Sequence, residues 1–147
     1  MGLTIRGKFK GSQEWDMGYI TFGLLRIDLA HAINEEYGDH YQDMYYHPRG
    51  DWSEYNKKTA ALEKKLKLRI RATDFLWMSD CEGKLSLMKC KALLDQIQNF
   101  DSKTLYGYIG RGIDQCMTIT DFKNLLNECF SRRCYMVWSG KGYGTDE

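Results

Sequence analysis

Hydrophobic and polar residues follow two different periods along the chain, and the change between them predicts where strands give way to helices. Residues 3–9 alternate apolar and polar side chains with a period of two, which is typical of a half-buried strand. From Thr21 to Tyr37 the apolar residues recur every three or four positions, as on one face of a helix. We expect Thr21 to cap the start of this helix and Gly38 to end it.

Three more helices are predicted, over residues 53–66, 86–99 and 121–132. The first is favoured by its many good helix formers, and the other two by an apolar stripe with the helical period. Ser86 and Thr120 precede the apolar stripes of the last two, and we expect them to be the N-caps because their hydroxyl groups can accept from free backbone N–H groups.

The remaining segments are less regular. Residues 134–138 are an apolar run that predicts a strand, whereas the alternation over 66–71 fits either a strand or the end of the preceding helix. We expect residues 73–84 to be a connector, with Gly83 in a tight turn. Glycines punctuate residues 101–117, which include a possible short strand at 105–109.

These elements predict one α+β domain over residues 1–147, with a small, mainly antiparallel sheet and three or four helices packed on it. Strands 3–9 and 134–138 should be neighbours, because each is too short to be stable alone and each helix stripe needs an apolar surface. We expect the tail, residues 139–147, to be solvated.

Composition excludes several classes of function. The formal net charge is +1, which does not supply the broad attraction on which non-specific DNA binders depend. No apolar run approaches the length of a membrane span, and the first residues lack the apolar core of a signal peptide. We therefore expect a cytoplasmic protein that binds no membrane.

The five cysteines contain no C-x-x-C pair. Cys90 and Cys129 fall on the apolar stripes of the helices over 86–99 and 121–132. We expect both to be buried thiols, without a disulfide or a metal.

Residues 38–55 are rich in aromatic side chains and show no apolar periodicity, so we expect a long irregular segment there, of the kind that is often functional. The charge is also polarised. Residues 28–54 hold seven acidic residues and one basic residue, and residues 57–71 hold seven basic residues and one acidic residue. Two solvated faces would explain this pattern, and so would a ligand site.

A ligand that carries both a base and phosphates suits such a pattern, because aromatic rings stack on bases and Arg side chains grip phosphate oxygens. The candidate stacking residues are Tyr45, Tyr46 and Trp52. Arg69 and Arg71 are the candidate phosphate ligands. If residues 66–71 form a strand, both would project from one face about 7 Å apart.

Other candidate motifs fail on their spacing. On one helix Asp28, His31 and Glu35 would share a face, but no recognised metal pattern is present, and we expect ordinary histidines and no metal or other cofactor. Residues 79–85 lack the decisive ligands of a calcium loop. The glycine-rich segment 107–112 matches no phosphate-binding motif. No nucleophile motif occurs, so we do not expect an enzyme.

Two segments resemble a loose group of small proteins from phages, prophages and Firmicutes genomes. Residues 1–5 (MGLTI) are similar to the group's MGLDI opening, and residues 79–86 (SDCEGKLS) followed by CK are similar to its SDCDGxLS segment. Thr4 and Glu82 stand where the group has Asp. The helix and strand at the end of the chain also match the group's usual ending.

A phage-like origin implies a protein that counters host defence. With this context, the aromatic segment beside the basic run and the lack of catalytic motifs predict a non-enzymatic protein that sequesters a small nucleotide-like immune signal in the cytoplasm of a bacterial host. The alternative is a protein–protein inhibitor of a defence system, similar to an anti-CRISPR protein, because an aromatic surface of mixed charge is also typical of an interface.

Overall fold

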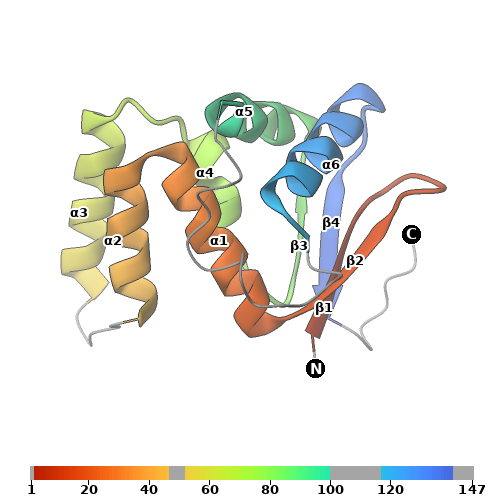
Figure 1. Ribbon diagram of the computed structural model, residues 1–147. Helices are drawn as coiled ribbons and strands as arrows, with labels where there is room; N and C mark the ends of the chain where they lie inside the picture. Colours follow the sequence, from red (N-terminus) through yellow and green to blue (C-terminus); the bar gives the residue numbers. More distant parts are fainter. Residues whose placement is uncertain (1, 47–51, 100–116, 141–147) are drawn as a thin grey trace.

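The computed structural model describes residues 2–46, 52–99 and 117–140, which form a small α+β domain (Figure 1). In chain order the elements are β1 (Gly2–Gly7), β2 (Glu14–Gly18), α1 (Tyr19–Ile33), α2 (Glu35–Tyr46), α3 (Trp52–Lys65), α4 (Ile70–Trp77), β3 (Glu82–Leu85), α5 (Leu87–Ile97), α6 (Ile119–Ser131) and β4 (Met136–Gly140). This architecture confirms the predicted fold class.

The sheet is antiparallel throughout, with the strand order β2-β1-β4-β3. β1 lies between β2 and β4, so Ile5 is opposite both Trp15 and Trp138. The predicted pairing of the first and last strands is therefore confirmed. The last strand starts two residues later than predicted, and Ser139 and Gly140 belong to it rather than to a solvated tail.

The period-two pattern of β1 separates its two faces as predicted. Leu3 and Ile5 are fully buried, whereas Thr4 and Arg6 are only partly covered. On the more open face the Thr4 hydroxyl donates to Asp16 Oδ1 of β2 at 2.6 Å. The apolar face of the sheet is the one that supports the core.

Four aromatic rings form the centre of that core. Phe22 of α1, Phe75 of α4, Phe122 of α6 and Trp138 of β4 pack with ring centroids 5.0 to 6.3 Å apart. α1 is buried around most of its circumference, with a continuous buried run from Leu24 to His31. Helices from distant parts of the sequence thus meet the sheet at one point.

The predicted helix over 21–37 is in fact two helices that turn at Asn34. Asn34 ends α1, and its side-chain oxygen accepts from the backbone N–H groups of Glu36 and Tyr37, which starts α2. The irregular structure predicted for 38–55 is wrong over residues 38–46 and 52–55, which are helical. Residues 47–51 lie outside the described segments.

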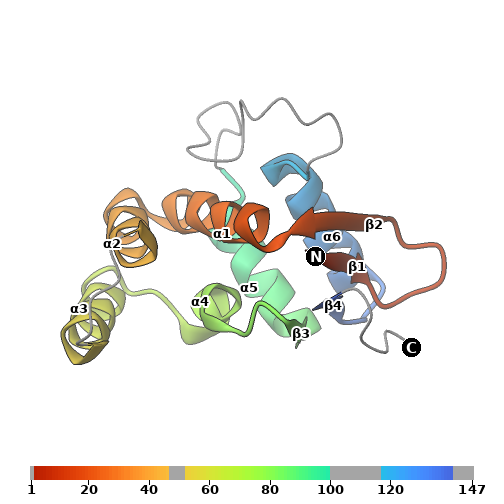
Figure 2. The same cartoon turned by 90° about the horizontal axis from the view of Figure 1, so that it is seen from below.

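The α2–α3 hairpin extends from one side of the molecule, away from the sheet (Figures 1 and 2). The start of α3 agrees with its prediction to within one residue. Among the described residues, no helix combines the length and apolar character that a membrane span requires.

Segment 66–71 is neither a strand nor a helix end. Lys67 adopts a left-handed backbone conformation (φ 56°) that turns the chain after α3, and α4 then begins at Ile70. The predicted connector 73–84 contains most of α4 and most of β3. Gly83 is not in a tight turn but in strand β3, opposite Trp138. Glycine is required there because an added Cβ would collide with the indole ring of Trp138.

Of the three predicted N-caps, only Ser86 is confirmed. Thr21 lies inside α1, which begins at Tyr19 after Gly18 and has no side-chain cap. Ser86 caps α5, as its side chain accepts from the Lys89 backbone N–H. α6 begins earlier than predicted, and its cap is Thr118 rather than Thr120, in a reciprocal capping box with Asp121. The possible strand at 105–109 falls in the part of the chain that is not described.

Candidate functional site

The α2–α3 hairpin is antiparallel, and polar contacts fix its register. His40 Nε2 lies 2.7 Å from Thr59 Oγ1, and at the open end of the hairpin Glu36 forms an ion pair with Lys65. Between them the Tyr37 hydroxyl donates to Glu63 Oε2. This register brings the last turn of α2 beside the first turn of α3.

Three half-exposed aromatic side chains gather at that end of the hairpin, and we call Tyr45, Tyr46 and Trp52 the aromatic patch. Tyr46 is 51% exposed and Trp52 48% exposed. The Tyr45 and Tyr46 rings meet edge to face at 5.2 Å, and the Trp52 ring packs on Tyr55. The three predicted stacking residues therefore lie on the surface rather than in the core.

The two predicted phosphate ligands lie elsewhere. Arg69 is the N-cap of α4 and Arg71 is in its first turn, both exposed. They follow the C-terminal end of α3, whereas Trp52 is its first residue. α3 has 14 residues, so its ends are about 20 Å apart at 1.5 Å per residue. The structure does not bring these arginines to the aromatic patch, and the strand geometry that would pair them is absent.

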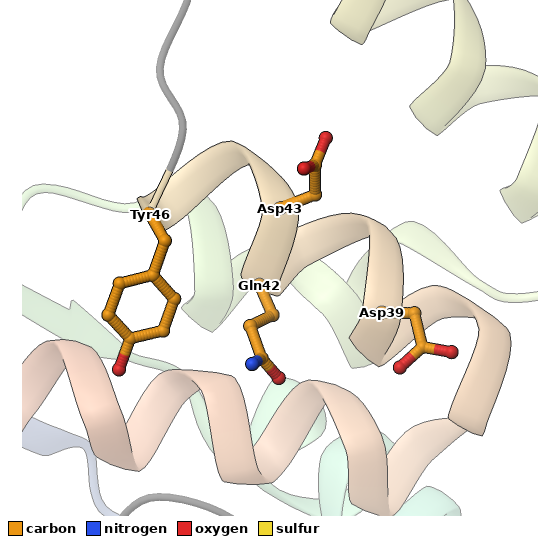
Figure 3. A pocket seen from close by; sticks show the side chains of 4 residues that line it. All are labelled: Asp39, Gln42, Asp43 and Tyr46. Atoms are coloured by element: carbon orange, nitrogen blue, oxygen red, sulfur yellow. The ribbon is translucent and has the colours of Figure 1, made fainter.

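A shallow acidic hollow adjoins the aromatic patch on α2. It has a volume of about 500 Å³ and is lined by Asp39, Gln42, Asp43 and Tyr46. Figure 3 shows Gln42 and Tyr46 directed toward α1 and Asp43 directed away from it. The charge beside the Tyr46 ring is therefore negative, which disfavours phosphate and favours a cationic group.

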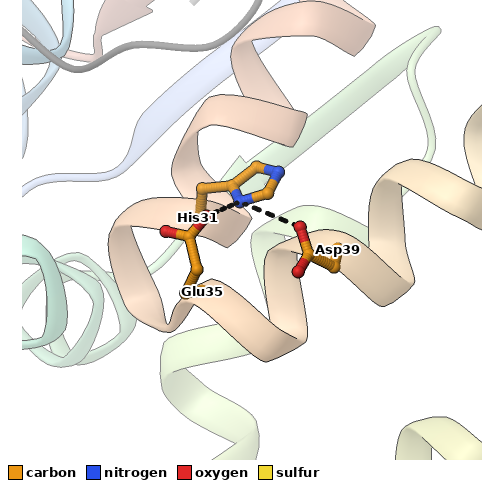
Figure 4. A group of neighbouring side chains, drawn as sticks. All are labelled: His31, Glu35 and Asp39. Carbon is orange, nitrogen blue, oxygen red and sulfur yellow. Dashed lines mark ion pairs between the residues drawn. The ribbon is translucent and has the colours of Figure 1, made fainter.

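A buried histidine of α1, His31, lies beside the start of α2. The His31 Nδ1 atom is 3.4 Å from Glu35 Oε1 and 3.9 Å from Asp39 Oδ1 (Figure 4). On the other side of the ring, Nε2–H donates to Gln42 Oε1 at 2.9 Å. Gly38 permits this arrangement, because any Cβ there would overlap the imidazole. The sequence grouped His31 and Glu35 correctly, but it chose Asp28 as the third member instead of Asp39.

His40 behaves as the ordinary hydrogen-bonding histidine that was predicted. The Thr59 hydroxyl donates to the Tyr55 carbonyl at 2.8 Å, so it accepts from His40 Nε2–H. Burial, reinforced by the charge of Lys58, lowers the pKa of His40. The neutral ring therefore links α2 to α3. His47 lies among the residues that the structure does not describe.

A buried cation was not predicted. The Arg26 guanidinium stacks 4.3 Å from the Phe22 ring centroid and donates to the Ser79 carbonyl. Beside it the Tyr41 hydroxyl donates to the Leu76 carbonyl, and burial raises the pKa of Tyr41 to about 12. Arg26 joins the end of α4 to α1 and Tyr41 joins it to α2, which is a structural role. An arginine within an apolar run is the one sequence signal that marks this position.

Cys90 and Cys129 are both buried, as their positions on the apolar stripes predict. Their thiols interact, and the hydrogen bond with Cys90 raises the pKa of Cys129. Burial also raises the pKa of the less enclosed Cys134, to about 11. Cys81 is exposed, and Cys116 is not among the described residues.

Comparison with protein-family models, with curated proteins and with solved structures finds no match. The resemblance to small phage proteins therefore depends on the residues quoted for it. In the structure, residues 79–86 form the approach to β3, the strand itself and the N-cap of α5. The glycine-rich segment 107–112 lies outside the described residues.

Proposed function

We propose that this chain is a non-enzymatic protein that inhibits a bacterial defence protein by direct contact through the aromatic patch. The observation that supports this most is the exposure of Tyr45, Tyr46 and Trp52 together at one end of a projecting hairpin. Large aromatic side chains within a polar rim are typical of the residues that dominate protein–protein affinity.

The chemistry around the patch specifies the partner surface. Asp39 and Asp43 line the adjoining hollow, so a partner that inserts a Lys or Arg side chain beside Tyr46 would complement it in charge and shape. Proteins that handle nucleic acid carry basic surfaces of this kind. We therefore propose a nucleic-acid-handling defence protein as the target, in the manner of an anti-CRISPR protein.

The defence context comes from the resemblance of residues 1–5 and 79–86 to small phage proteins. It favours the cytoplasm of a bacterial host as the compartment in which such an inhibitor would meet its target. The contact surface does not depend on this context, because it is inferred from the exposed rings and the adjoining acidic hollow.

Sequestration of a nucleotide-like immune signal is the second candidate. Its support is that the half-exposed Tyr46 and Trp52 rings offer faces on which a base could stack. Arg69 and Arg71 are too distant to hold the phosphates of the same small ligand. Lys57 and Lys58, one to two turns along α3 from Trp52, would have to replace them.

The test begins with a tagged chain incubated in host lysate, followed by identification of retained proteins and calorimetry with the purified partner. Replacing Tyr46 and Trp52 together by Ala should weaken binding by at least 100-fold, because each buried aromatic anchor contributes about 2 kcal/mol or more. Tyr135→Ala is the matched control, since Tyr135 is 41% exposed but lies on the sheet side. Equal losses in both variants would contradict a role for the aromatic patch.

Small ligands separate the two candidates. Calorimetry against cyclic dinucleotides and ADP-ribose-type compounds should give no heat if the chain is a protein inhibitor. Saturable heat, or a nucleotide released when the purified protein is denatured, would instead support sequestration. Replacing Arg69 and Arg71 by Lys should leave either interaction unchanged, because neither residue lies near the rings.

A further inference from the structure

The cluster of His31, Glu35 and Asp39 combines an imidazole nitrogen with two carboxylates at the corner between α1 and α2. Their ligand atoms all lie within 4.8 Å of one another. The three side chains differ in burial, since His31 is enclosed whereas Glu35 and Asp39 are 62% and 71% exposed. The cluster is thus anchored on one side and open to solvent on the other.

Gln42 determines which histidine nitrogen faces the carboxylates. Because the amide oxygen of Gln42 can only accept, the proton of the neutral ring lies on Nε2. Nδ1 then directs its lone pair toward Glu35 and Asp39. A hydrogen bond of this kind to the distal nitrogen is the usual way in which proteins orient a metal-binding histidine.

A positive charge between a nitrogen lone pair and two anionic oxygens stabilises the group, and either a proton on Nδ1 or a metal ion can supply it. A proton would draw the oxygens to about 2.7–2.9 Å, the usual N–O distance of a charge-assisted hydrogen bond. The observed distances from Nδ1, 3.4 Å to Glu35 and 3.9 Å to Asp39, are both longer.

The longer distances match a metal centre. Zinc binds histidine nitrogen and carboxylate oxygen at about 2.0–2.2 Å, and two ligands of a tetrahedral ion are then about 3.3–3.5 Å apart. The separation of His31 Nδ1 from Glu35 Oε1 has this value, and the exposed Asp39 carboxylate needs to move by only about 0.5 Å to reach it.

We propose that His31, Glu35 and Asp39 bind a zinc-class divalent metal ion, with water as the fourth ligand. The donor set of one imidazole and two carboxylates suits zinc better than magnesium, which prefers oxygen ligands alone. The metal would tie the first turn of α2 to the end of α1 and so fix the corner at Asn34. This proposal does not depend on the proposed partner, because the ligands belong to the free chain.

The test uses the full chain after chelator treatment, titrated with Zn²⁺ alone in a calorimeter and followed by thermal unfolding. We expect one site and an increase in the unfolding temperature. Glu35→Gln and Asp39→Asn each keep the shape of an exposed side chain and should weaken Zn²⁺ binding at least tenfold. Glu36→Gln is the matched control, since it removes the same charge from the same helical turn and should change the affinity less than twofold.

A second measurement locates the metal. In ¹⁵N spectra of the histidine rings, Zn²⁺ should shift the Nδ1 signal of His31 while Nε2 keeps its proton. The proposal is overturned if Zn²⁺ does not bind, or if Glu35→Gln and Asp39→Asn bind it as tightly as the parent, which would place the ion on cysteine thiols or another histidine. If Glu36→Gln weakened Zn²⁺ binding equally, the losses would come from general surface charge and not from ligation, which would also overturn the proposal.

Discussion

Replacing Gly38 by Ala should destabilise the protein, although Ala is the better helix former. A Cβ at this position would lie 2.6 Å from the Cα of His31 and closer still to its ring. Carbon atoms normally pack at about 3.5–4.0 Å, so the overlap is about 1 Å and involves backbone that cannot rotate away. Overpacking of this kind costs about 3 kcal/mol, against a gain of about 1 kcal/mol in helix propensity.

The expected net loss is therefore about 2 kcal/mol, or about 30-fold in the unfolding equilibrium. Urea unfolding followed by circular dichroism would measure it, and the midpoint should fall by about 1 M. Two glycines serve as controls. Gly18→Ala meets no atom within 4 Å, and at Gly23 the nearest atoms to the new methyl group belong to the side chain of Tyr45 and not to backbone, so each should change stability by less than about 1 kcal/mol. A Gly38→Ala variant as stable as the parent would refute the close approach of α1 and α2 at His31.

Two further predictions concern the C-terminal half. Thr118→Ala should cost about 1 kcal/mol of stability in urea unfolding, because it removes the capping box of α6. Thr120→Ala, at an exposed helical position, should be nearly neutral. A larger loss for Thr120→Ala would show that Thr120 is the N-cap. With Cys116 replaced by Ser, a thiol reagent at pH 8 should label Cys81 well before Cys134, because a pKa of about 11 keeps the Cys134 thiol protonated. The labelling rate of Cys134 should rise about tenfold per pH unit toward pH 10 as its thiolate forms. Equal labelling rates of Cys81 and Cys134 at pH 8 would contradict the burial that raises the pKa of Cys134.

The core was predictable from sequence because burial imposes a period. The stripe that contains Phe122 and Cys129 identified α6, and the alternation of Leu3 and Ile5 identified β1. Both patterns are strong because every buried position on one face must be apolar. The adjacency of β1 and β4 followed from the same need to cover short strands.

The edge strands and α4 were harder to predict because their patterns are weak. In β2 the alternation consists of Trp15 and Met17 alone, and in β3 Leu85 is the one buried residue, so neither pattern is long enough to mark a strand. α4 has two turns, which is too short for a stripe to repeat. For α1 the apolar pattern is strong, but the predicted C-terminal end of the helix was wrong. Its far end is surrounded by other elements, so its apolar run did not mark where the helix stops.

The predicted ligand site combined the aromatic residues with the arginines of the basic run, and the fold places these two groups far apart. The aromatic residues and the basic run are adjacent in sequence, but α3 lies between Trp52 and Arg69 as a rigid spacer. Sequence proximity is a good guide to spatial proximity only within a turn or a hairpin. Here Tyr46 ends α2 and Trp52 begins α3, so the three aromatic positions lie at one end of the hairpin and the arginines follow its other end.

The cluster of His31, Glu35 and Asp39 depends on the chain turning at Asn34, and a short local sequence pattern indicates that turn. On a continuous helix His31 and Asp39 would be eight residues and about 12 Å apart along the axis, too far to share an ion. The turn at Asn34 folds α2 back, so that Nδ1 of His31 lies 3.9 Å from the Asp39 carboxylate. Asn34 followed by two acidic residues is the composition of a helix start, with an N-cap and negative charge in the first turn. Recognising that start within the apolar pattern would have divided the helix and replaced Asp28 by Asp39 in the predicted group.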